Sequence, residues 1–378
     1  MSTRTPSQWQ DYVQGCLDFR PVEGIYRVAR DIFTEPELFD LEMELIFEKQ
    51  WIYACHESEI ANPNDFITMR AGRQPMIITR DSHGELHALI NACQHRGATL
   101  TRQGAGNQST FTCPFHAWCY KSDGRLVKVK APGEYPEGFD KATRGLRKAR
   151  IESYKGFVFI SLDTYASDSL EDFLGDARIF FDMMVAQSPT GELEVLAGKS
   201  TYTYDGNWKL QNENGLDGYH VSTVHYNYVS TVQHRQQVNA EKGQGDSTLD
   251  YSKLGAGDEE TDDGWFSFHN GHSVLFSDMP NPDRAPRLRQ RHATAGRGIR
   301  AGPRRMDDAP PAQPEHLPQP VLHGPDQLAT AHRPPGGLEQ DRSDQPVHRG
   351  QGRVRGRPAQ SHPSVRGFLQ RLGHGHAG

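Results

Sequence analysis

Residues 93–116 read CQHRGATLTRQGAGNQSTFTCPFH, and the two ends of this stretch carry metal-binding side chains. Cys93 and His95 lie at its start, and Cys113 and His116 lie at its end. Each end therefore supplies one thiol and one imidazole. A [2Fe–2S] cluster takes this ligand set when two histidines replace two cysteines on one of its irons. The spacing predicts an electron-transfer site built from these four residues.

A single zinc ion bound by two cysteines and two histidines is the alternative for the same four side chains. Zinc fingers usually carry both cysteines on one loop and both histidines on another, whereas each end of this stretch has one of each. Cys55 and Cys119 lack this partnering, and we interpret them as buried structural thiols. Five cysteines in 378 residues also do not form the pattern of a secreted disulfide framework.

Short strands separated by turns are predicted on both sides of the two Cys–His pairs. The candidate strands are residues 66–69, 75–79, 86–91, 126–129 and 156–162. Each Cys–His pair then falls on a loop, and the tips of two loops in a small antiparallel β domain can converge on one site. Helical spacing of apolar residues marks 35–49 and 170–187, followed by a strand-like segment at 193–205 and more helix near 211–225.

A second group of metal-binding side chains lies in residues 207–225, NWKLQNENGLDGYHVSTVH. Asp217 and His220 are three residues apart and would share a helix face, but a step of five turns His225 well round the axis. Both histidines can bind one metal only if the helix ends, bends or bulges between them. Two histidines and a carboxylate form the facial triad of non-haem Fe(II) oxygenases. Asp217 can equally be an acceptor that orients a ligand histidine.

Composition and charge limit the possible partners. The net charge of −6 argues against general affinity for nucleic acid or for anionic membranes. The N-terminal sequence MSTRTPSQWQDY has no secretory signal, and the longest apolar runs, such as 156–162, are too short to span a bilayer. We therefore expect a soluble cytoplasmic protein with no nucleic acid and no membrane partner.

The composition changes abruptly at Ala285. From there to Gly378 the chain holds 15 arginines and no lysine, 13 prolines, 13 glycines, and Phe368 as its single aromatic residue. A segment with so few large apolar side chains cannot bury a competitive core. The composition therefore favours a disordered tail at residues 285–378. A basic arm that binds nucleic acid is the alternative, although arginine without any lysine is unusual for either.

Both metal-binding motifs resemble those of Rieske non-haem iron aromatic ring-hydroxylating dioxygenases, in the large (α) subunit. The text INACQHRGATL, TFTCPFHAWCY and GNWKLQNENGLDGYHVSTVH is similar to the benzoate, toluate and anthranilate 1,2-dioxygenase branch, and the resemblance covers roughly residues 20–284. It implies that Cys93 and Cys113 bind one cluster iron, and that His95 and His116 bind the other. It also implies that His220 and His225 bind a mononuclear Fe(II). Asp217 matches the family's bridging aspartate, which hydrogen-bonds a ligand of that iron and a Rieske histidine of a neighbouring subunit.

The fold that this resemblance implies is α+β. Residues 51–165 would form a small antiparallel β Rieske domain. Residues 166–284 would form the N-terminal part of an α+β catalytic domain with an antiparallel sheet and helices, in a helix-grip-like arrangement. Residues 1–50 would be an N-terminal helical segment that packs with the catalytic domain.

The resemblance also implies a reaction and partners. The reaction would be O₂- and NADH-dependent cis-1,2-dihydroxylation of an aromatic carboxylate such as anthranilate, benzoate or a substituted benzoate. Electrons would come from an NADH-dependent flavin/iron–sulfur reductase and pass through the cluster to the Fe(II). The assembly would be α3β3, with a small β subunit.

One family feature has no counterpart here, namely the aspartate near the C-terminus that supplies the third ligand of the mononuclear iron. Synonymous codons for residues 366–378 allow a shifted frame to read EDFFNVSGMGTPD, and the same frame gives family-like text at 306–308 and 317–325. We hypothesise a one-base frameshift near residues 286–287 that makes 285–378 aberrant. The chain as written would then have little dioxygenase activity.

Two other classes of protein remain as alternatives. An electron carrier would hold the cluster alone, and an inactive truncated form of the oxygenase would do the same. A zinc-binding interaction protein would hold no iron. The second histidine pair argues against a carrier, which has no use for it. Metal content separates the three classes, because the oxygenase holds both a cluster and a further iron.

Overall fold

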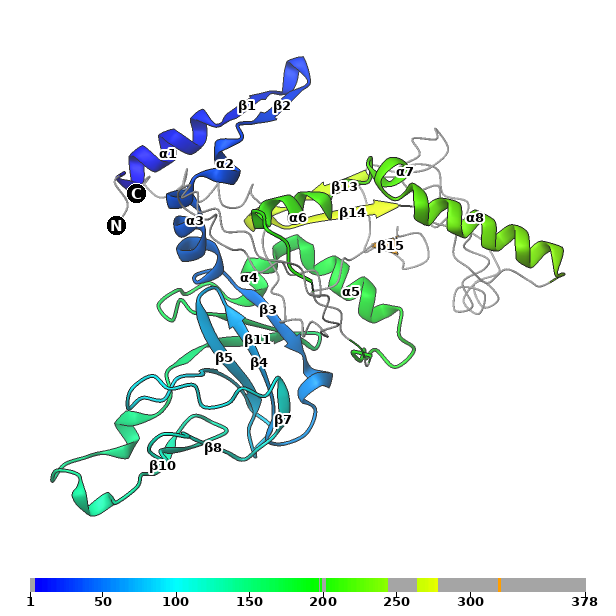
Figure 1. The fold of residues 1–378 in the computed structure, drawn as a ribbon. Coiled ribbons are helices and arrows are strands. Elements are labelled where there is room, and N and C mark those ends of the chain that lie inside the picture. Colours follow the sequence, from blue (N-terminus) through cyan, green and yellow to red (C-terminus); the bar gives the residue numbers. More distant parts are fainter. Residues whose placement is uncertain (1–3, 197, 199–201, 244–263, 278–318, 321–378) are drawn as a thin grey trace, which may run out of the picture. The chain divides into compact units, whose positions relative to one another are not determined.

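The computed structural model describes residues 4–196, 198, 202–243, 264–277 and 319–320 (Figure 1). Their contacts divide the chain into two compact units. The first comprises the described residues up to Asn212 together with His269–His272, and the second comprises the described parts of Glu213–Phe268 and Ser273–His323. Among the described helices, none combines the length and the apolar character that crossing a bilayer requires.

A seven-stranded antiparallel sheet forms the centre of the first unit, with the strand order β3-β12-β11-β6-β5-β4-β7. Its strands are β3 (Ile52–His56), β4 (Asp65–Ala71), β5 (Gln74–Arg80), β6 (Leu86–Ile90), β7 (Ala105–Asn107), β11 (Lys148–Tyr154) and β12 (Phe157–Ser161). The predicted strands at 66–69, 75–79, 86–91 and 156–162 are therefore confirmed, with ends that differ by a few residues.

Strand β5 is buried on both faces, which explains its almost continuous apolar sequence. Met76 and Ile78 belong to the core on one face of the sheet. Ile77 belongs to the core on the other face, which also contains Cys93 and Cys113. Successive side chains of a strand point to opposite faces. One strand thus supports both the general core of the unit and the cysteines of the candidate cluster.

A smaller antiparallel sheet carries the second Cys–His pair. It consists of β8 (Thr110–Thr112), β9 (Cys119–Lys121) and β10 (Leu126–Lys128), in the order β10-β9-β8. Its residues Phe111, Tyr120 and Leu126 are buried in the same core as the two cysteines. The prediction of a strand at 126–129 and of a small antiparallel β domain is confirmed.

The N-terminal part is helical at both ends and holds a hairpin between them. It contains α1 (Pro6–Gly15), β1 (Leu17–Arg20), β2 (Ile25–Val28), α2 (Asp31–Thr34), α3 (Pro36–Glu42) and the π-helical turn η2 (Met43–Phe47). The helix predicted at 35–49 is confirmed, but the hairpin was not predicted. Gly24, with a φ of 67°, reverses the chain between the two strands, and the strands are too exposed to show an apolar pattern.

A buried ion pair links α3 to α6 (Trp208–Asn214). Lys209 Nζ donates to Glu42 Oε1 at 2.5 Å, and Trp208 Nε1 donates to Glu42 Oε2 at 2.8 Å. The side chains of Glu42 and Lys209 are 1% and 2% exposed. Burial raises the pKa of Glu42, and Lys209 opposes that rise. The pair fixes the start of the helix that leads to the second histidine group.

Helices α4 (Leu170–Leu174) and α5 (Arg178–Ala186) confirm the helix predicted at 170–187, with the short 3-10 turn η6 (Gly175–Ala177) between them. The strand predicted at 193–205 is wrong for the residues that the structure describes, since 193–196, 198 and 202–205 form no strand. Gly198 has a φ of 114°, which interrupts an extended backbone. Residues 197 and 199–201 lie outside the described part.

The second unit contains α7 (Val221–Val224), α8 (Tyr226–Glu241) and three antiparallel strands. These strands are β13 (Gly264–Ser267), β14 (Ser273–Ser277) and β15 (Gln319–Pro320), with β14 in the middle. Apart from residues 319–320, the segment 285–378 lies outside the described residues. The expectations of a frameshift and of disorder there stay predictions.

Candidate functional site

Cys93 and Cys113 occupy equivalent positions in two turns with the same hydrogen-bond pattern. The Cys93 N–H donates to the carbonyl five residues ahead at 2.9 Å, and the Cys93 carbonyl accepts from the Gly97 N–H at 2.7 Å. The corresponding distances for Cys113 are 2.8 Å and, from Ala117, 3.0 Å. Gly97 and Ala117 both have a positive φ, at 74° and 57°. The first turn lies between β6 and β7, and the second joins β8 to β9.

The structure brings the four predicted ligands together, with thiols inside and imidazoles outside. Cys93 and Cys113 are buried in the same core, and Cys113 contributes to the raised pKa of the Cys93 thiol. His95 is half-buried and His116 is exposed. Their ring centroids lie 4.6 Å apart and the ring planes are nearly perpendicular, at 89°. This arrangement fits a [2Fe–2S] cluster held by cysteines on its inner iron and by histidines on its outer iron.

The spread of the four ligand atoms disfavours a single zinc ion. Ligand atoms around one tetrahedral zinc lie roughly 3.3–3.8 Å apart, given bonds of about 2.0 Å to nitrogen and about 2.3 Å to sulfur. Among the described residues, the one set of three His, Cys, Asp or Glu side chains with all ligand atoms within 4.8 Å of one another is Asp81, Glu85 and His87. No three of the four loop residues meet that condition, so the structure does not gather them around a single ion.

Three further residues support the site, and sequence reasoning missed them. Tyr120 places its hydroxyl 3.3 Å from Cys93 Sγ and accepts the Gln94 N–H at 3.0 Å. Trp118 stacks on the His95 ring at 5.3 Å between centroids. Buried Asn91 accepts two backbone N–H groups, from residues 100 and 101, and so closes the first loop. For Trp118 and Tyr120, the available signal was their position directly after the second Cys–His pair.

Burial shifts the titration of this site. Burial raises the pKa of the Cys93 thiol, and it also raises the pKa of Tyr120, with Cys93 adding to that rise. Burial lowers the pKa of His95, and the neighbouring His116 and Arg96 lower it further. The lowered pKa favours the neutral imidazole, which is the form that binds iron. Metal binding must remove the thiol proton.

The second group of predicted ligands lies where the helix is interrupted. Helix α6 ends at Asn214, directly before Gly215, and α7 begins after His220. His225 separates α7 from α8 and has non-helical φ and ψ of −96° and 19°. The one turn of helix between the two histidines, α7, ends at Val224 directly before His225, so the structure has the helix end that the sequence required.

His220 and His225 aim the same ring atom at each other. Their Nε2 atoms lie 3.1 Å apart. Two imidazole nitrogens bound about 2.1 Å from one metal at about 90° would be about 3.0 Å apart, so the pair fits neighbouring ligands of one ion. Asp217 Oδ2 lies 3.1 Å from His220 Nδ1, on the other side of the ring. That contact is not an aligned hydrogen bond, since His220 Nδ1 has no hydrogen-bond partner among the described residues.

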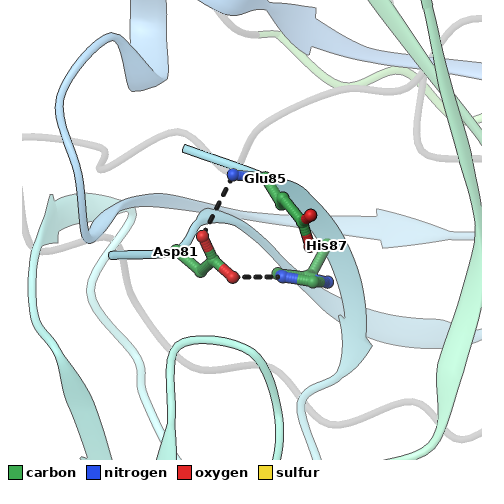
Figure 2. A group of neighbouring side chains, drawn as sticks. All are labelled: Asp81, Glu85 and His87. Carbon is green, nitrogen blue, oxygen red and sulfur yellow. Dashed lines mark hydrogen bonds and ion pairs between the residues drawn. The ribbon is translucent and has the colours of Figure 1, made fainter. Parts of the chain in front are cut away.

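Asp81, Glu85 and His87 lie close together because hydrogen bonds of Asp81 close the β5–β6 hairpin. Figure 2 shows the Asp81 carboxylate between the Glu85 backbone and the His87 ring. One Asp81 oxygen accepts the His83 and Glu85 N–H groups at 2.8 Å and 3.0 Å, and the other lies 2.9 Å from His87 Nε2. Both oxygens are thus engaged in closing the turn.

Two protein families match the chain, and each match includes one of the two residue groups. Residues 50–154 match the Rieske [2Fe-2S] domain, and residues 193–340 match the catalytic domain of ring-hydroxylating α subunits. The first match contains Cys93, His95, Cys113 and His116, and the second contains 217–225. The second match also continues past Ala285. Together the two families imply a Rieske cluster and a mononuclear iron as cofactors.

Two similar proteins and one similar structure extend this finding. The anthranilate 1,2-dioxygenase large subunit of Acinetobacter baylyi is 78% identical over 286 residues, which cover 76% of this chain and 61% of that protein. The toluate 1,2-dioxygenase subunit alpha of Pseudomonas putida is 48% identical over 75% of this chain and 62% of that protein. The chain spans about three fifths of the length of these relatives.

The solved structure of naphthalene 1,2-dioxygenase from a Rhodococcus species, bound to indole, has a TM-score of 0.59 to this chain. The two are 30% identical, over 75% of this chain and 62% of that one. This similarity confirms the α+β fold class, with an antiparallel Rieske domain and a catalytic domain of sheet and helices.

Proposed function

The chain belongs to the family of Rieske-type aromatic ring-hydroxylating oxygenase large (α) subunits, and on this premise we propose that it is the oxygenase subunit of an aromatic-carboxylate 1,2-dioxygenase. The proposed reaction is O₂- and NADH-dependent cis-1,2-dihydroxylation of anthranilate, benzoate or a substituted benzoate. The identity to the large subunits of anthranilate and toluate 1,2-dioxygenases supports this substrate class.

We assign Cys93 and Cys113 to one iron of the cluster, and His95 and His116 to the other. His220 and His225 are the proposed protein ligands of the mononuclear iron. When bound, the cluster supplies single electrons and the mononuclear iron supplies the site of O₂ chemistry. The observation that carries the proposal is the 3.1 Å approach of His220 Nε2 and His225 Nε2, in a chain that also holds the Rieske domain.

Asp217 is proposed as a bridge that orients His220 and not as a direct ligand. Its carboxylate lies on the Nδ1 side of His220, whereas the ring atom that faces His225 is Nε2. Once aligned as an acceptor of the Nδ1–H, a carboxylate in that place would fix the tautomer that leaves Nε2 available to a metal. The Asp217 side chain is also 50% exposed, which supports a role across a subunit boundary.

The proposed assembly and domains follow the family. The chain would form α3β3 with a small β subunit in the cytoplasm and would accept electrons from an NADH-dependent flavin/iron–sulfur reductase. The proposed domain division is 1–50, 51–165 and 166–284, with 285–378 as an aberrant tail. A single O₂-uptake experiment with the frame-corrected protein, its reductase, NADH and a panel of aromatic carboxylates tests the substrate class. Uptake without any dependence on an aromatic carboxylate would contradict it.

Iron binding tests the second site without relying on activity. We expect His220→Ala and His225→Ala to lose the iron that is present in excess of the cluster, while the visible absorption of the cluster stays. His234→Ala is the matched control, since His234 is an exposed histidine of α8 outside the group. Equal iron in all four proteins would exclude His220 and His225 as ligands and favour a cluster-only electron carrier.

A further inference from the structure

A basic surface covers part of the cluster-binding domain, although the whole chain carries a net charge of −6. Residues 121–148 contain eight lysines and arginines against four acidic residues, and all eight cations are exposed. Among the described residues, Arg125 alone of these cations pairs with a carboxylate, that of Asp123 at 2.6 Å. We refer to these exposed cations of 121–148 as the basic surface.

Local contacts hold this segment together as one patch. Lys141 Nζ donates to the Val127 carbonyl at 3.4 Å, so η5 (Lys141–Arg144) lies against β10. The Leu146 N–H donates to the Gly124 carbonyl at 2.8 Å, which brings the end of the segment back to the β9–β10 turn. In Figure 1 the chain after β10 extends away from the small sheet and then returns.

Aromatic side chains connect the basic surface to a cluster ligand. His95 stacks on Trp118 with the ring planes 18° apart, and Trp118 Nε1 donates to the Tyr135 hydroxyl at 2.8 Å. The Tyr135 and Phe139 rings lie 4.4 Å apart, and both residues are half-buried within the segment 121–148. A protein docked on this segment would be separated from His95 by two aromatic layers.

We propose that the basic surface is the docking site of an acidic electron-donor protein. This inference rests on the proposed function, because it requires a [2Fe–2S] cluster at the four loop ligands. One electron leaves the reduced donor and is accepted at that cluster, and no atom is transferred. Opposite charges steer two proteins together and raise the association rate, an effect that salt suppresses. The local positive charge on a negative chain therefore selects an acidic partner.

The test measures how fast the cluster is reduced. Holoprotein is mixed in a stopped-flow instrument with a reduced acidic plant-type [2Fe–2S] ferredoxin, and separately with the reduced zwitterionic propyl viologen sulfonate, which needs no docking. At low ionic strength we expect Lys128→Glu/Lys130→Glu to slow reduction by the ferredoxin at least about tenfold. Salt at about 0.5 M should reduce the difference. The viologen should reduce parent and variant at equal rates.

Two further proteins make the result decisive. Arg27→Glu/Arg30→Glu changes the same number of charges at exposed positions outside the basic surface and should match the parent. Lys128→Gln/Lys130→Gln, a milder change, should give a smaller loss in the same direction. Equal ferredoxin rates for Lys128→Glu/Lys130→Glu and the parent would overturn this inference alone, as would an equal loss in the arginine variant. A parent protein without cluster absorption would overturn the proposed function as well.

Discussion

At the scale of single residues, Tyr120 is the side chain outside the four ligands with the most direct access to the cluster. Its hydroxyl lies 3.3 Å from Cys93 Sγ. A hydrogen bond to a ligand sulfur stabilises the reduced, more negative cluster and so raises its reduction potential. We expect Tyr120→Phe to lower the potential by roughly 40 mV, which corresponds to one hydrogen bond of about 1 kcal/mol. Redox titration followed by electron-spin resonance measures this shift, and an unchanged potential would contradict it.

The two Cys–His turns place Gly97 and Ala117 at equivalent positions with a positive φ. Substitutions at these positions measure what a Cβ costs in this backbone conformation. Gly97 has room for a Cβ, since nothing lies within 4 Å of it, so Gly97→Ala meets only the strain of its positive φ. We expect Gly97→Ala to cost about 1 kcal/mol and Ala117→Gly to gain up to about 1 kcal/mol. Urea unfolding of both variants gives the two values. If both variants were less stable than the parent, or both more stable, strain at the positive φ would not be what determines stability at these two positions.

The sequence was sufficient to propose the metal ligands but not the residues around them. Cys93, His95, Cys113 and His116 are recognisable because their residue types and spacing are specific for one kind of cluster. Tyr120, Trp118 and Asn91 support the site through packing and hydrogen bonds that depend on which loops converge. Such contacts have no fixed spacing along the chain, so the sequence contains no equally specific signal for them.

At the scale of elements, the ion pair between α3 and α6 holds the start of the segment that we propose to bind iron. Replacing Lys209 by methionine leaves the Glu42 carboxyl buried without its cation, which we expect to cost roughly 3–5 kcal/mol. The double variant Glu42→Leu/Lys209→Met should recover most of that loss, because no charge then remains buried. Urea unfolding of the parent and both variants provides the comparison.

The pH dependence of Lys209→Met gives a second check. Burial already raises the pKa of Glu42, and loss of Lys209 raises it further. The unfolded chain ionises Glu42 at ordinary pH while the folded variant keeps it protonated. The loss of stability should therefore grow as pH rises above the ordinary glutamate range and should disappear below it. A loss that is independent of pH would contradict a buried, titrating Glu42.

The β5–β6 turn gives a further prediction at this scale. Burial alone would raise the pKa of Asp81, but hydrogen bonds from His87 and from two backbone N–H groups lower it to about 2. The folded pKa is below the unfolded one, so the stabilisation is complete above about pH 4 and is lost as pH falls through about 2. The shift corresponds to about 2 kcal/mol. Asp81→Asn should remove this acid-dependent part of stability, whereas the exposed control Asp11→Asn should retain it in urea unfolding between pH 5 and pH 2.

Periodicity predicted those elements of the first unit whose apolar patterns are strong. The helices at 35–49 and 170–187 and four strands of the large sheet were all confirmed. The β1–β2 hairpin escaped because both strands are largely exposed, so burial imposes no alternation on them. The predicted strand at 193–205 failed in its described residues because the apolar pattern does not reveal the positive φ of Gly198.

At the scale of the whole molecule, two groups of metal-binding side chains in one chain define the proposed oxygenase. The sequence predicted that the helix must end, bend or bulge before both His220 and His225 can reach one metal, and in the structure α7 ends at Val224, directly before His225. The division into an antiparallel β domain and a domain of sheet and helices was likewise predictable from the resemblance. For the tail from Ala285 onward, the composition predicts disorder, whereas the match to the catalytic-domain family continues to residue 340.

The central claim is that Cys93, His95, Cys113 and His116 hold a Rieske-type cluster. Quantification of iron, acid-labile sulfide and zinc in the purified protein, combined with pulsed electron-spin resonance of the reduced form, tests it most directly. The account predicts at least two irons and two sulfides per chain, with nitrogen couplings from two histidines in the cluster signal. A colourless protein that contains one zinc per chain, or a cluster signal without histidine nitrogen, would contradict it.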